Sequence, residues 1–246
     1  MNVDVHDKSD EASQSSNSIY LDGSYLEKNK NWHSEDSPWK ALQISRLLQS
    51  NNIRPETICE VGCGAGKILD ELSHVLPNTK FYGYEISPQA YELCKIYESE
   101  KIDFFNEDIL SEESFYDCLL CIDVIEHVED YIGFAKALRK KAKYKIFHIP
   151  LDISIRSVLH SSMMGHRKGV GHLHYFVTET ALATLEDSGY EILDWFYTKG
   201  FEVDPCDRST TVSEKIMKIA RSILYFFSPK LMVRLLGGCS LMVLSK

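Results

Sequence analysis

The stretch Glu60-Val61-Gly62-Cys63-Gly64-Ala65-Gly66 decides the fold of this chain. It follows the apolar run TICEV and leads into a helical pattern that starts at Lys67. Glycines here permit a tight turn from a strand into a helix and let a ligand approach the backbone, while the helix start offers unpaired amides. The GxGxG spacing differs from the GxGxxG dinucleotide fingerprint, which needs glycine at position 67, and no GK[ST] follows as in a Walker A loop.

Strand-like and helix-like segments alternate around this turn. Short runs rich in β-branched, aromatic and cysteine residues read TICEV, KFYGYEI, IDFFNE, YDCLLCIDV and YKIFHIP. Helical patterns separate these runs, and helices are expected at 66–76, 88–99, 130–142 and 178–188. Two further strands are expected in GYEILDWFYT and CSLMVLS. Strands joined by helical crossovers form parallel sheets. The sequence therefore predicts an α/β fold, a doubly wound, Rossmann-like, seven-stranded and mainly parallel sheet with helices on both faces.

The chain is expected to form one domain over residues 19–246. Residues 1–18 have almost no large apolar side chains and are predicted to be a disordered tail. A helical cap is expected over 19–52, with a helix that opens at Ser37-Pro38. Two insertions follow the fifth and sixth strands: an acceptor-binding segment over 151–177 and a helical segment over 198–238.

Composition favours small-molecule chemistry. The 246 residues are 44% apolar and carry a net charge of -9, so a nucleic acid would need a local basic patch that the sequence does not display. We therefore expect a small-molecule substrate and no nucleic acid. The seven cysteines show no disulfide framework, which predicts a cytoplasmic location. No run is apolar enough to span a bilayer, although an interfacial helix near the C-terminus stays open.

Acidic residues stand where the predicted strands end, which is the sheet edge at which ligands bind in such folds. Glu85 ends the second strand, Asn106-Glu107-Asp108-Ile109 ends the third, and Asp123-Val124-Ile125-Glu126-His127-Val128 ends the fourth. With EVGCGAG, these motifs resemble class I S-adenosylmethionine-dependent methyltransferases over about residues 55–197 and the last strand. The resemblance implies an antiparallel last strand, S-adenosylmethionine as cofactor and S-adenosylhomocysteine as product.

The resemblance also implies where the cofactor binds. In the family the acid at Glu85 meets the ribose hydroxyls, the acid at Asp108 meets the adenine amino group, and the apolar neighbour Ile109 lies against the ring. The full set of expected cofactor contacts is Glu60, Gly62, Cys63, Gly64, Gly66, Glu85, Ile86, Asp108, Ile109 and Asp123.

Histidines are the candidates for a base that removes a proton from the acceptor. His127 lies in the fourth-strand motif, His148 ends the fifth strand, and His172 and His174 lie in GHRKGVGHLHYF, where an extended chain would face both the same way. The acceptor contacts expected from the cap and the first insertion are Arg156, His160, Arg167, Lys168, Tyr175 and Trp39. A solvated basic loop and a zinc site at the HxH stay open as alternatives for GHRKGVGHLHYF.

A metal ion is the alternative to a histidine base. Asp123, Glu126 and His127 have i, i+3, i+4 spacing, which places them on one face of a helix if the segment is helical. A similar pattern holds a divalent cation in ubiquinone-pathway O-methyltransferases, and oxygen ligands would favour Mg²⁺. The preferred prediction has no metal.

The leading hypothesis is an O-methyltransferase for a small polar or anionic metabolite. The segment before the core and HLHYF resemble bacterial methyltransferases associated with surface polysaccharides, which implies a sugar, nucleotide-linked or phosphoryl-containing precursor as acceptor. The alternatives are a metal-dependent, ubiquinone-type catechol O-methyltransferase and a non-catalytic cofactor-binding protein. The acceptor atom and the oligomeric state stay open.

Overall fold

The computed structural model describes residue 32 and residues 34–203 and 210–246. Seven strands form one sheet in the order β3-β2-β1-β4-β5-β7-β6, and only β7 runs antiparallel to its neighbours. The sequence prediction of a doubly wound sheet with an antiparallel last strand is confirmed. The strands are β1 (Thr57–Val61), β2 (Lys80–Tyr84), β3 (Ile102–Phe105), β4 (Tyr116–Ile122), β5 (Ala142–Pro150), β6 (Ile192–Thr198) and β7 (Ser240–Ser245).

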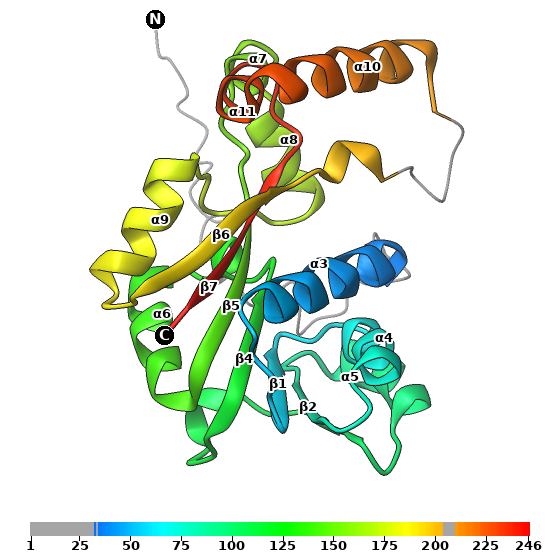
Figure 1. Ribbon diagram of the computed structural model, residues 1–246, viewed down its shortest axis with the longest axis vertical. Helices are drawn as coiled ribbons and strands as arrows, with labels where there is room; N and C mark the ends of the chain where they lie inside the picture. The colour runs from blue at the N-terminus through cyan, green and yellow to red at the C-terminus, as the bar shows by residue number, and fades with distance from the viewer. Residues whose placement is uncertain (1–31, 33, 204–209) are drawn as a thin grey trace, which may run out of the picture.

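Helices cover both faces of the sheet (Figure 1). The α-helices in the described residues are α3 (Ser37–Ser50), α4 (Lys67–Val75), α5 (Pro88–Cys94), α6 (Tyr131–Leu138), α7 (Ile155–Leu159), α8 (Ser162–Gly169), α9 (Thr178–Asp187), α10 (Val212–Phe227) and α11 (Pro229–Leu236). Short 3₁₀ turns are η1 (Ser34–Asp36), η2 (Lys95–Tyr97), η3 (Ile109–Ser111), η4 (Ile125–His127), η5 (Arg139–Lys141) and η6 (Gly200–Glu202).

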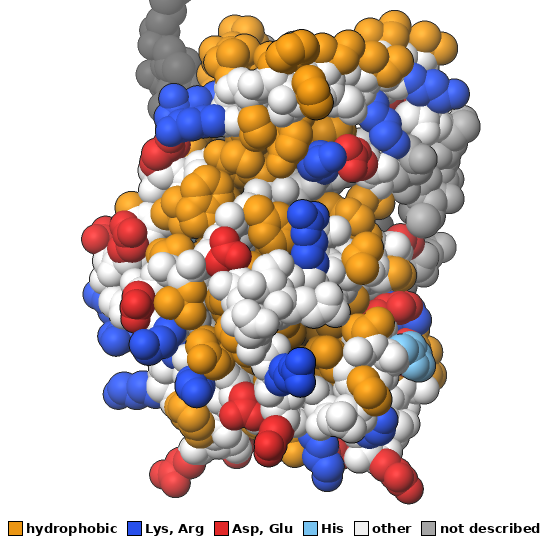
Figure 2. Space-filling view, in the orientation of Figure 1, with side chains coloured by type: hydrophobic (Ala, Val, Ile, Leu, Met, Phe, Trp, Pro, Cys, Tyr) orange, Lys and Arg blue, Asp and Glu red, His pale blue; other side chains and the backbone are white. Residues whose placement is uncertain are grey.

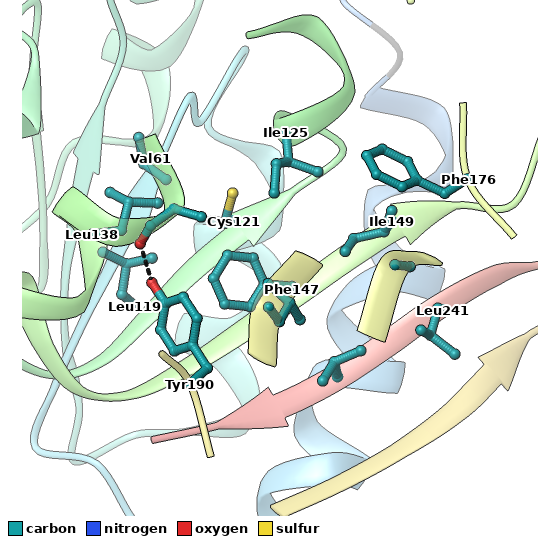
Figure 3. Close-up of a cluster of buried hydrophobic side chains, with 14 of the residues drawn as sticks. Val61, Leu119, Cys121, Ile125, Leu138, Phe147, Ile149, Phe176, Tyr190 and Leu241 are labelled. Atoms are coloured by element: carbon teal, nitrogen blue, oxygen red, sulfur yellow. Dashed lines mark hydrogen bonds between the residues drawn. The ribbon is translucent and has the colours of Figure 1, made fainter. Parts of the chain in front are cut away.

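Two apolar clusters hold the helices against the sheet. Helices α3, α4 and α5 bury residues such as Ile44 and Leu69 in one cluster. Helices α6, α9 and α11 bury residues such as Leu138 and Leu185 in the other. Figure 3 shows part of this second cluster, where the buried Tyr190 hydroxyl donates a 2.6 Å hydrogen bond to the Ala135 carbonyl. Since both faces are covered, the parallel strands are apolar on both sides.

Strand β4 shows this burial most directly. Cys118 and Leu120 point into the α3–α4–α5 cluster, while Leu119 and Cys121 point into the α6–α9–α11 cluster. Successive side chains of a strand alternate between faces, so the two cysteines of the CxxC sequence lie on opposite sides of the sheet. Both are free and buried.

The register of the sheet places the ends of β1, β2, β4 and β5 next to one another. Val61 at the end of β1 pairs with Tyr84 of β2 and with Cys121 of β4, and Ile122 of β4 pairs with His148 of β5. The residues that follow these strands therefore lie at one edge of the sheet, as expected for the ligand-binding edge of an open α/β fold.

The two ends of the domain differ in detail from the sequence prediction. Helix α3 begins at Ser37 with Asp36 as its N-cap residue, one position earlier than predicted, and Pro38 lies in its first turn. The predicted tail, residues 1–18, and most of the 19–52 cap before Ser34 lie outside the described residues. The 198–238 segment contains the two predicted helices, α10 and α11.

The segment GHRKGVGHLHYF is partly helical, which corrects its interpretation as a glycine-flanked loop. Its first residues, 165–169, form the second half of α8, and the chain is irregular from Gly171 to Val177. Ser161, with a φ of 53°, separates α7 from α8. Helices α7, α8, α10 and α11 gather beyond one end of the sheet (Figure 1).

Candidate functional site

A pocket of about 410 Å³ lies at the edge where the strands β1, β2, β4 and β5 end. Its wall includes the glycine turn, Glu85, residues 122–124 and 126–128, and His148. The segment before and within α3 covers one side through Trp32 and Trp39, and His172 lies on another. The volume falls in the range of small-molecule sites.

The glycine turn forms the floor of this pocket. Gly62, Gly64 and Gly66 have φ values of 63°, 56° and 76°, which L-residues rarely adopt. A Cβ at Gly62 would come within 2.9 Å of the Val124 side chain, and one at Gly66 within 2.6 Å of the Phe104 ring. The sequence needs glycine here because both the backbone conformation and the close neighbours exclude a side chain.

Glu85 fixes the shape of the turn. Its two carboxylate oxygens accept hydrogen bonds from the Gly64 amide at 2.9 Å and the Ser87 amide at 2.8 Å. The side chain is buried, and burial raises its pKa against the effect of these bonds. Since each carboxylate oxygen has more than one lone pair, Glu85 keeps capacity to accept hydrogen bonds from a ligand hydroxyl in the pocket.

Glu60 places an unpaired acid beside the turn. It is 2% exposed, and its Oε2 has no hydrogen-bond partner within the described part of the chain. Burial raises its pKa well above the usual range, and the nearby positive charge of Lys40 opposes that rise. A buried carboxyl without a partner is costly, so a cationic ligand in the pocket would supply the missing interaction.

An ionic network ties the cap helix to the sheet. Asp123 accepts from Lys40 Nζ at 2.8 Å and from His148 Nδ1 at 2.6 Å, and His148 Nε2 lies 2.8 Å from Thr198 Oγ1. Burial alone would raise the pKa of Asp123, but the charges of His148 and Lys40 hold it well below its usual range. The carboxylate is therefore ionised, and both ring nitrogens of His148 already have partners.

A second cluster surrounds His172. Its Nδ1 lies 2.6 Å from Asp152 Oδ2, while His166 Nδ1 lies 3.0 Å from the other oxygen of Asp152. Although burial alone would raise the pKa of Asp152, the hydrogen bonds from His166 and His172 lower it to about 2. The ring of His127 meets that of His172 edge-on at 5.0 Å between centroids.

Glu126 lies between these imidazoles with an unpaired carboxyl. Its Oε1 is 3.8 Å from His127 Nε2 and 3.9 Å from His172 Nε2, and neither oxygen has a hydrogen-bond partner among the described residues. Burial, and then the charge of Asp123, raise its pKa well above the usual range. Burial also lowers the pKa of His127 to about 4. The backbone explains the proximity, because the Glu126 carbonyl accepts from the amides of Leu173 and His174.

The fourth-strand motif is not an α-helix, so the condition under which its three groups would share one helical face is not met. Asp123 has a φ of 53° and precedes the 3₁₀ turn η4, so it does not share a helical face with Glu126 and His127. The metal-capable groups that the structure does bring together are Glu126, His127 and His172, and Asp152, His166 and His172, each with ligand atoms within 4.8 Å.

His172 and His174 do not face the same way. His174 Nε2 donates to the Val128 carbonyl at 2.9 Å, and its ring packs on Tyr131 at 4.3 Å between centroids. Only His172 of the two lines the pocket. The segment is irregular rather than a strand, so the alternation expected of an extended chain does not apply.

Several predicted ligand contacts lie outside the pocket wall. Asp108 is exposed and caps η3 through Leu110, and Ile109 is buried in the apolar core. The predicted acceptor clamp is also absent from the wall, because Arg167, Lys168 and His160 are exposed on or beside short helices, and Tyr175 donates to backbone carbonyls. Pocket residues predicted from sequence are Glu60, Gly62, Cys63, Gly64, Glu85, Ile86, Asp123, His127, His148, His172 and Trp39.

Other functional residues carried little sequence signal. Lys40 sits in an ordinary helix, and only the fold brings it to Asp123. Asp152 follows the fifth strand by two positions, so the rule that strand ends bear ligands could have singled it out. Trp32 lies against the glycine turn, since a Cβ at Gly64 would meet its indole at 2.7 Å.

Comparisons with known proteins agree with this site. The family described as "Methyltransferase domain" matches residues 32–194. The chain is 30% identical over 106 residues to tRNA N(3)-methylcytidine methyltransferase trm141 of Schizosaccharomyces pombe (41% of this chain, 42% of the relative). It is 25% identical over 109 residues to a ubiquinone biosynthesis O-methyltransferase of Hydrogenovibrio crunogenus (42% of this chain, 44% of the relative). The matches thus span less than half the length of these curated relatives.

Solved structures show the same fold. The N-methyltransferase NodS from Bradyrhizobium japonicum WM9, in complex with S-adenosylhomocysteine, superposes with a TM-score of 0.58 at 16% identity, covering 90% of this chain and 95% of that one. This chain belongs to the family described as "Methyltransferase domain".

Proposed function

We propose that the protein O-methylates a small polar metabolite, with His172 as the base that accepts the hydroxyl proton. The observation that carries this proposal is the Asp152–His172 pair on the pocket wall. A hydroxyl acceptor must lose its proton during transfer, and a positioned imidazole is the usual group for that task near neutral pH.

The acidic side of the pocket suits the methyl donor. S-adenosylmethionine supplies an electrophilic methyl group on a sulfonium ion and also carries an ammonium group. Glu60, with its unpaired buried oxygen, and Glu85 at the glycine turn are the acids that would face these positive charges and the ribose hydroxyls. The chain's part on this side is to bind and orient the donor and to exclude water, which Trp32 and Trp39 assist by covering the turn.

The other three histidines are less suited to the base role. Both nitrogens of His148 are bonded, and His174 lies outside the wall. The pKa of His127 is lowered to about 4, so that ring is a weak base. In His172, Nδ1–H donates to Asp152, which leaves the lone pair on Nε2; no hydrogen bond to Nε2 occurs in the described residues.

The acceptor that fits this wall is a neutral polyol, such as a sugar unit of a polysaccharide precursor. Acidic side chains outnumber lysines on the wall, and Lys40 is already paired with Asp36 and Asp123. The basic side chains predicted to hold a phosphate or carboxylate lie elsewhere. A cytoplasmic location is part of the proposal, because the described cysteines are all free.

Mass spectrometry after incubation with an isotopically labelled methyl donor tests this function. The acceptor panel contains sugars, nucleotide sugars, catechols and, given the tRNA-modifying relative, total tRNA. We expect labelled product from the neutral sugars. His172→Gln should abolish turnover while S-adenosylhomocysteine still binds in calorimetry, whereas His174→Gln serves as the control with turnover largely kept. Labelled tRNA without labelled sugar would contradict the proposal.

A metal-dependent O-methyltransferase is the second candidate, and the unpaired Glu126 carboxyl favours it. Glu126, His127 and His172 can supply one oxygen and two imidazole nitrogens. Such a ligand set suits Zn²⁺, Mn²⁺ or Fe²⁺ better than Mg²⁺. Mg²⁺ would favour a set made of oxygen ligands. In this candidate His172 would help to hold the ion, and the bound ion would supply Lewis-acid assistance to the deprotonation of a catechol-like acceptor.

Treatment with EDTA distinguishes the histidine-base candidate from the metal-dependent candidate. If the metal candidate holds, EDTA should abolish turnover, re-addition of one of these ions should restore it, and Glu126→Gln should weaken ion binding measured by calorimetry. Full turnover after EDTA treatment, with no ion in elemental analysis, would leave His172 as the base.

A further inference from the structure

We propose that α10, together with the neighbouring α7, α8 and α11, forms a docking surface for a bilayer that contains anionic lipid. We call it the apolar ridge and define it by the exposed α10 side chains Val212, Ile216, Ile219, Ile223, Phe226 and Phe227. The proposal does not depend on the identity of the acceptor.

The ridge follows one face of α10. Its residues recur every three or four positions, which is the spacing of one helical face. Ile216 is 62% exposed, and Phe226 is 84% exposed. The helix cannot turn this face inward, because Leu224 and Tyr225 on the other side pack against the core and Arg221 donates to the Leu236 carbonyl.

The ridge continues onto neighbouring helices. Helix α11 packs against both α10 and α7, and α7 packs against α8. Each of these helices adds exposed apolar side chains, such as Leu159 and Met164. Figure 2 shows the apolar side chains gathered over this end of the molecule, with lysines and arginines beside them. Apolar patches of this kind mark interaction sites.

The charge of this end is opposite to that of the whole chain. Residues 212–236 contain five Lys or Arg and one Glu, and residues 155–170 contain three Lys or Arg and no acid, which gives these two segments a net charge of +7. Glu179 of α9 pairs with two of these cations, Lys230 and Arg234. The chain as a whole carries -9. An apolar helix face flanked by basic side chains is the profile of a helix that lies in the interface of an anionic membrane.

This charge also argues against a second copy as the occupant. A two-fold symmetric dimer through the ridge would place the two positive ends against each other, whereas anionic lipid neutralises them. No helix in the described part of the chain has the length and apolar character to cross a membrane. The ridge therefore fits a helix that lies on a bilayer.

The ridge adjoins the pocket. Val170, the C-cap residue that follows α8, lines the pocket, and so does Gly200 at the start of η6. The Phe201 ring of η6 lies under the guanidinium of Arg221 from α10. Docking through the ridge would therefore hold the His172 side of the pocket near the lipid surface.

Vesicle sedimentation tests the proposal. We expect the protein to sediment with phosphatidylcholine vesicles that contain phosphatidylglycerol, and much less with phosphatidylcholine alone or at high salt. Phe226→Glu and Ile219→Glu should each reduce binding by about tenfold, because each removes a large apolar side chain from the interface. Lys215→Glu combined with Lys168→Glu should abolish the preference for phosphatidylglycerol.

Phe115→Glu is the matched control. Phe115 is 65% exposed and precedes β4, away from the ridge, so its replacement should leave vesicle binding unchanged. Circular dichroism and S-adenosylhomocysteine binding report that each variant is folded, independently of methyl transfer. Absence of vesicle binding by the native chain, equal loss in the Phe115 variant, or a stable dimer or protein complex that buries the ridge without vesicle binding would each overturn the proposal.

Discussion

Two carboxyls with opposite protonation lie a few residues apart at the end of β4. Asp123 is paired with Lys40 and His148 and is ionised, whereas Glu126 is buried without a partner and its pKa is raised. In the sequence, Asp123 and Glu126 are simply two acidic residues of one motif. Their environments, which come from α3, β5 and the 172–174 segment, decide their charge.

The raised pKa of Glu126 predicts a pH-dependent stability. A carboxyl whose folded pKa lies above its unfolded value is favourable below about pH 4, and this contribution is lost as the pH rises toward the folded pKa. Glu126→Gln keeps the shape without a titrating proton, so in metal-free buffer it should raise the melting temperature at pH 8 and change it little at pH 4. Thermal melts across that range measure this. A lower melting temperature of the variant at pH 8 in EDTA would contradict the raised pKa.

The base assignment predicts a change in the pH profile of turnover. Asp152→Asn removes the carboxylate that orients His172 and stabilises its protonated form, so the apparent pKa of kcat should fall and kcat should drop by about 10²–10⁴-fold. Donor affinity should change little. Because His166 also contacts Asp152, His166→Gln is the matched control and should leave most of the turnover. An unchanged pH profile in the Asp152 variant would show that His172 is not the base.

At the level of elements, the turn between β1 and α4 is the least replaceable connection in the chain. Its Gly66 caps α4 in the left-handed region and touches Phe104 and Cys94 of neighbouring elements. Helix α8, by contrast, contains Gly165, where an added Cβ would meet nothing within 4 Å. The same residue type is thus obligatory in one element and dispensable in another.

These two glycines make a matched pair of substitutions. Gly66→Ala should destabilise the protein by about 1–3 kcal/mol, because alanine strains the backbone there and its Cβ overlaps the Phe104 ring. Gly165→Ala, within α8 with open space around it, should be neutral or stabilise by up to about 1 kcal/mol. Urea denaturation of both variants gives the comparison, and similar free energies of unfolding would contradict it.

In the whole molecule, the link from Lys40 to Asp123, His148 and Thr198 joins the cap helix to β4, β5 and β6. This network closes one side of the pocket and joins residues that are more than 150 positions apart in the sequence. The surface pairs of Lys67 with Asp70 and Glu71, by contrast, stay within one helix.

Breaking this link should cost far more than breaking a surface pair. Lys40→Ala leaves the half-buried Asp123 carboxylate with one partner fewer and should destabilise by about 1–3 kcal/mol. Lys67→Ala should change stability by less than about 1 kcal/mol. Urea denaturation measures both. Equal losses would show that the cap is not held by this network.

The sequence alone determined the fold class, the order of strands and helices along the chain, and the sheet edge at which the pocket lies. Strand alternation, helical spacing and the glycine turn are local features, so they can be predicted from neighbouring residues alone. Tertiary structure decided the rest: which histidine enters the pocket, that Asp108 and the predicted basic clamp lie outside it, and that Lys40, Asp123 and His148 meet. These outcomes depend on contacts between segments far apart in the chain, where burial and charge partners are set by packing and not by local pattern.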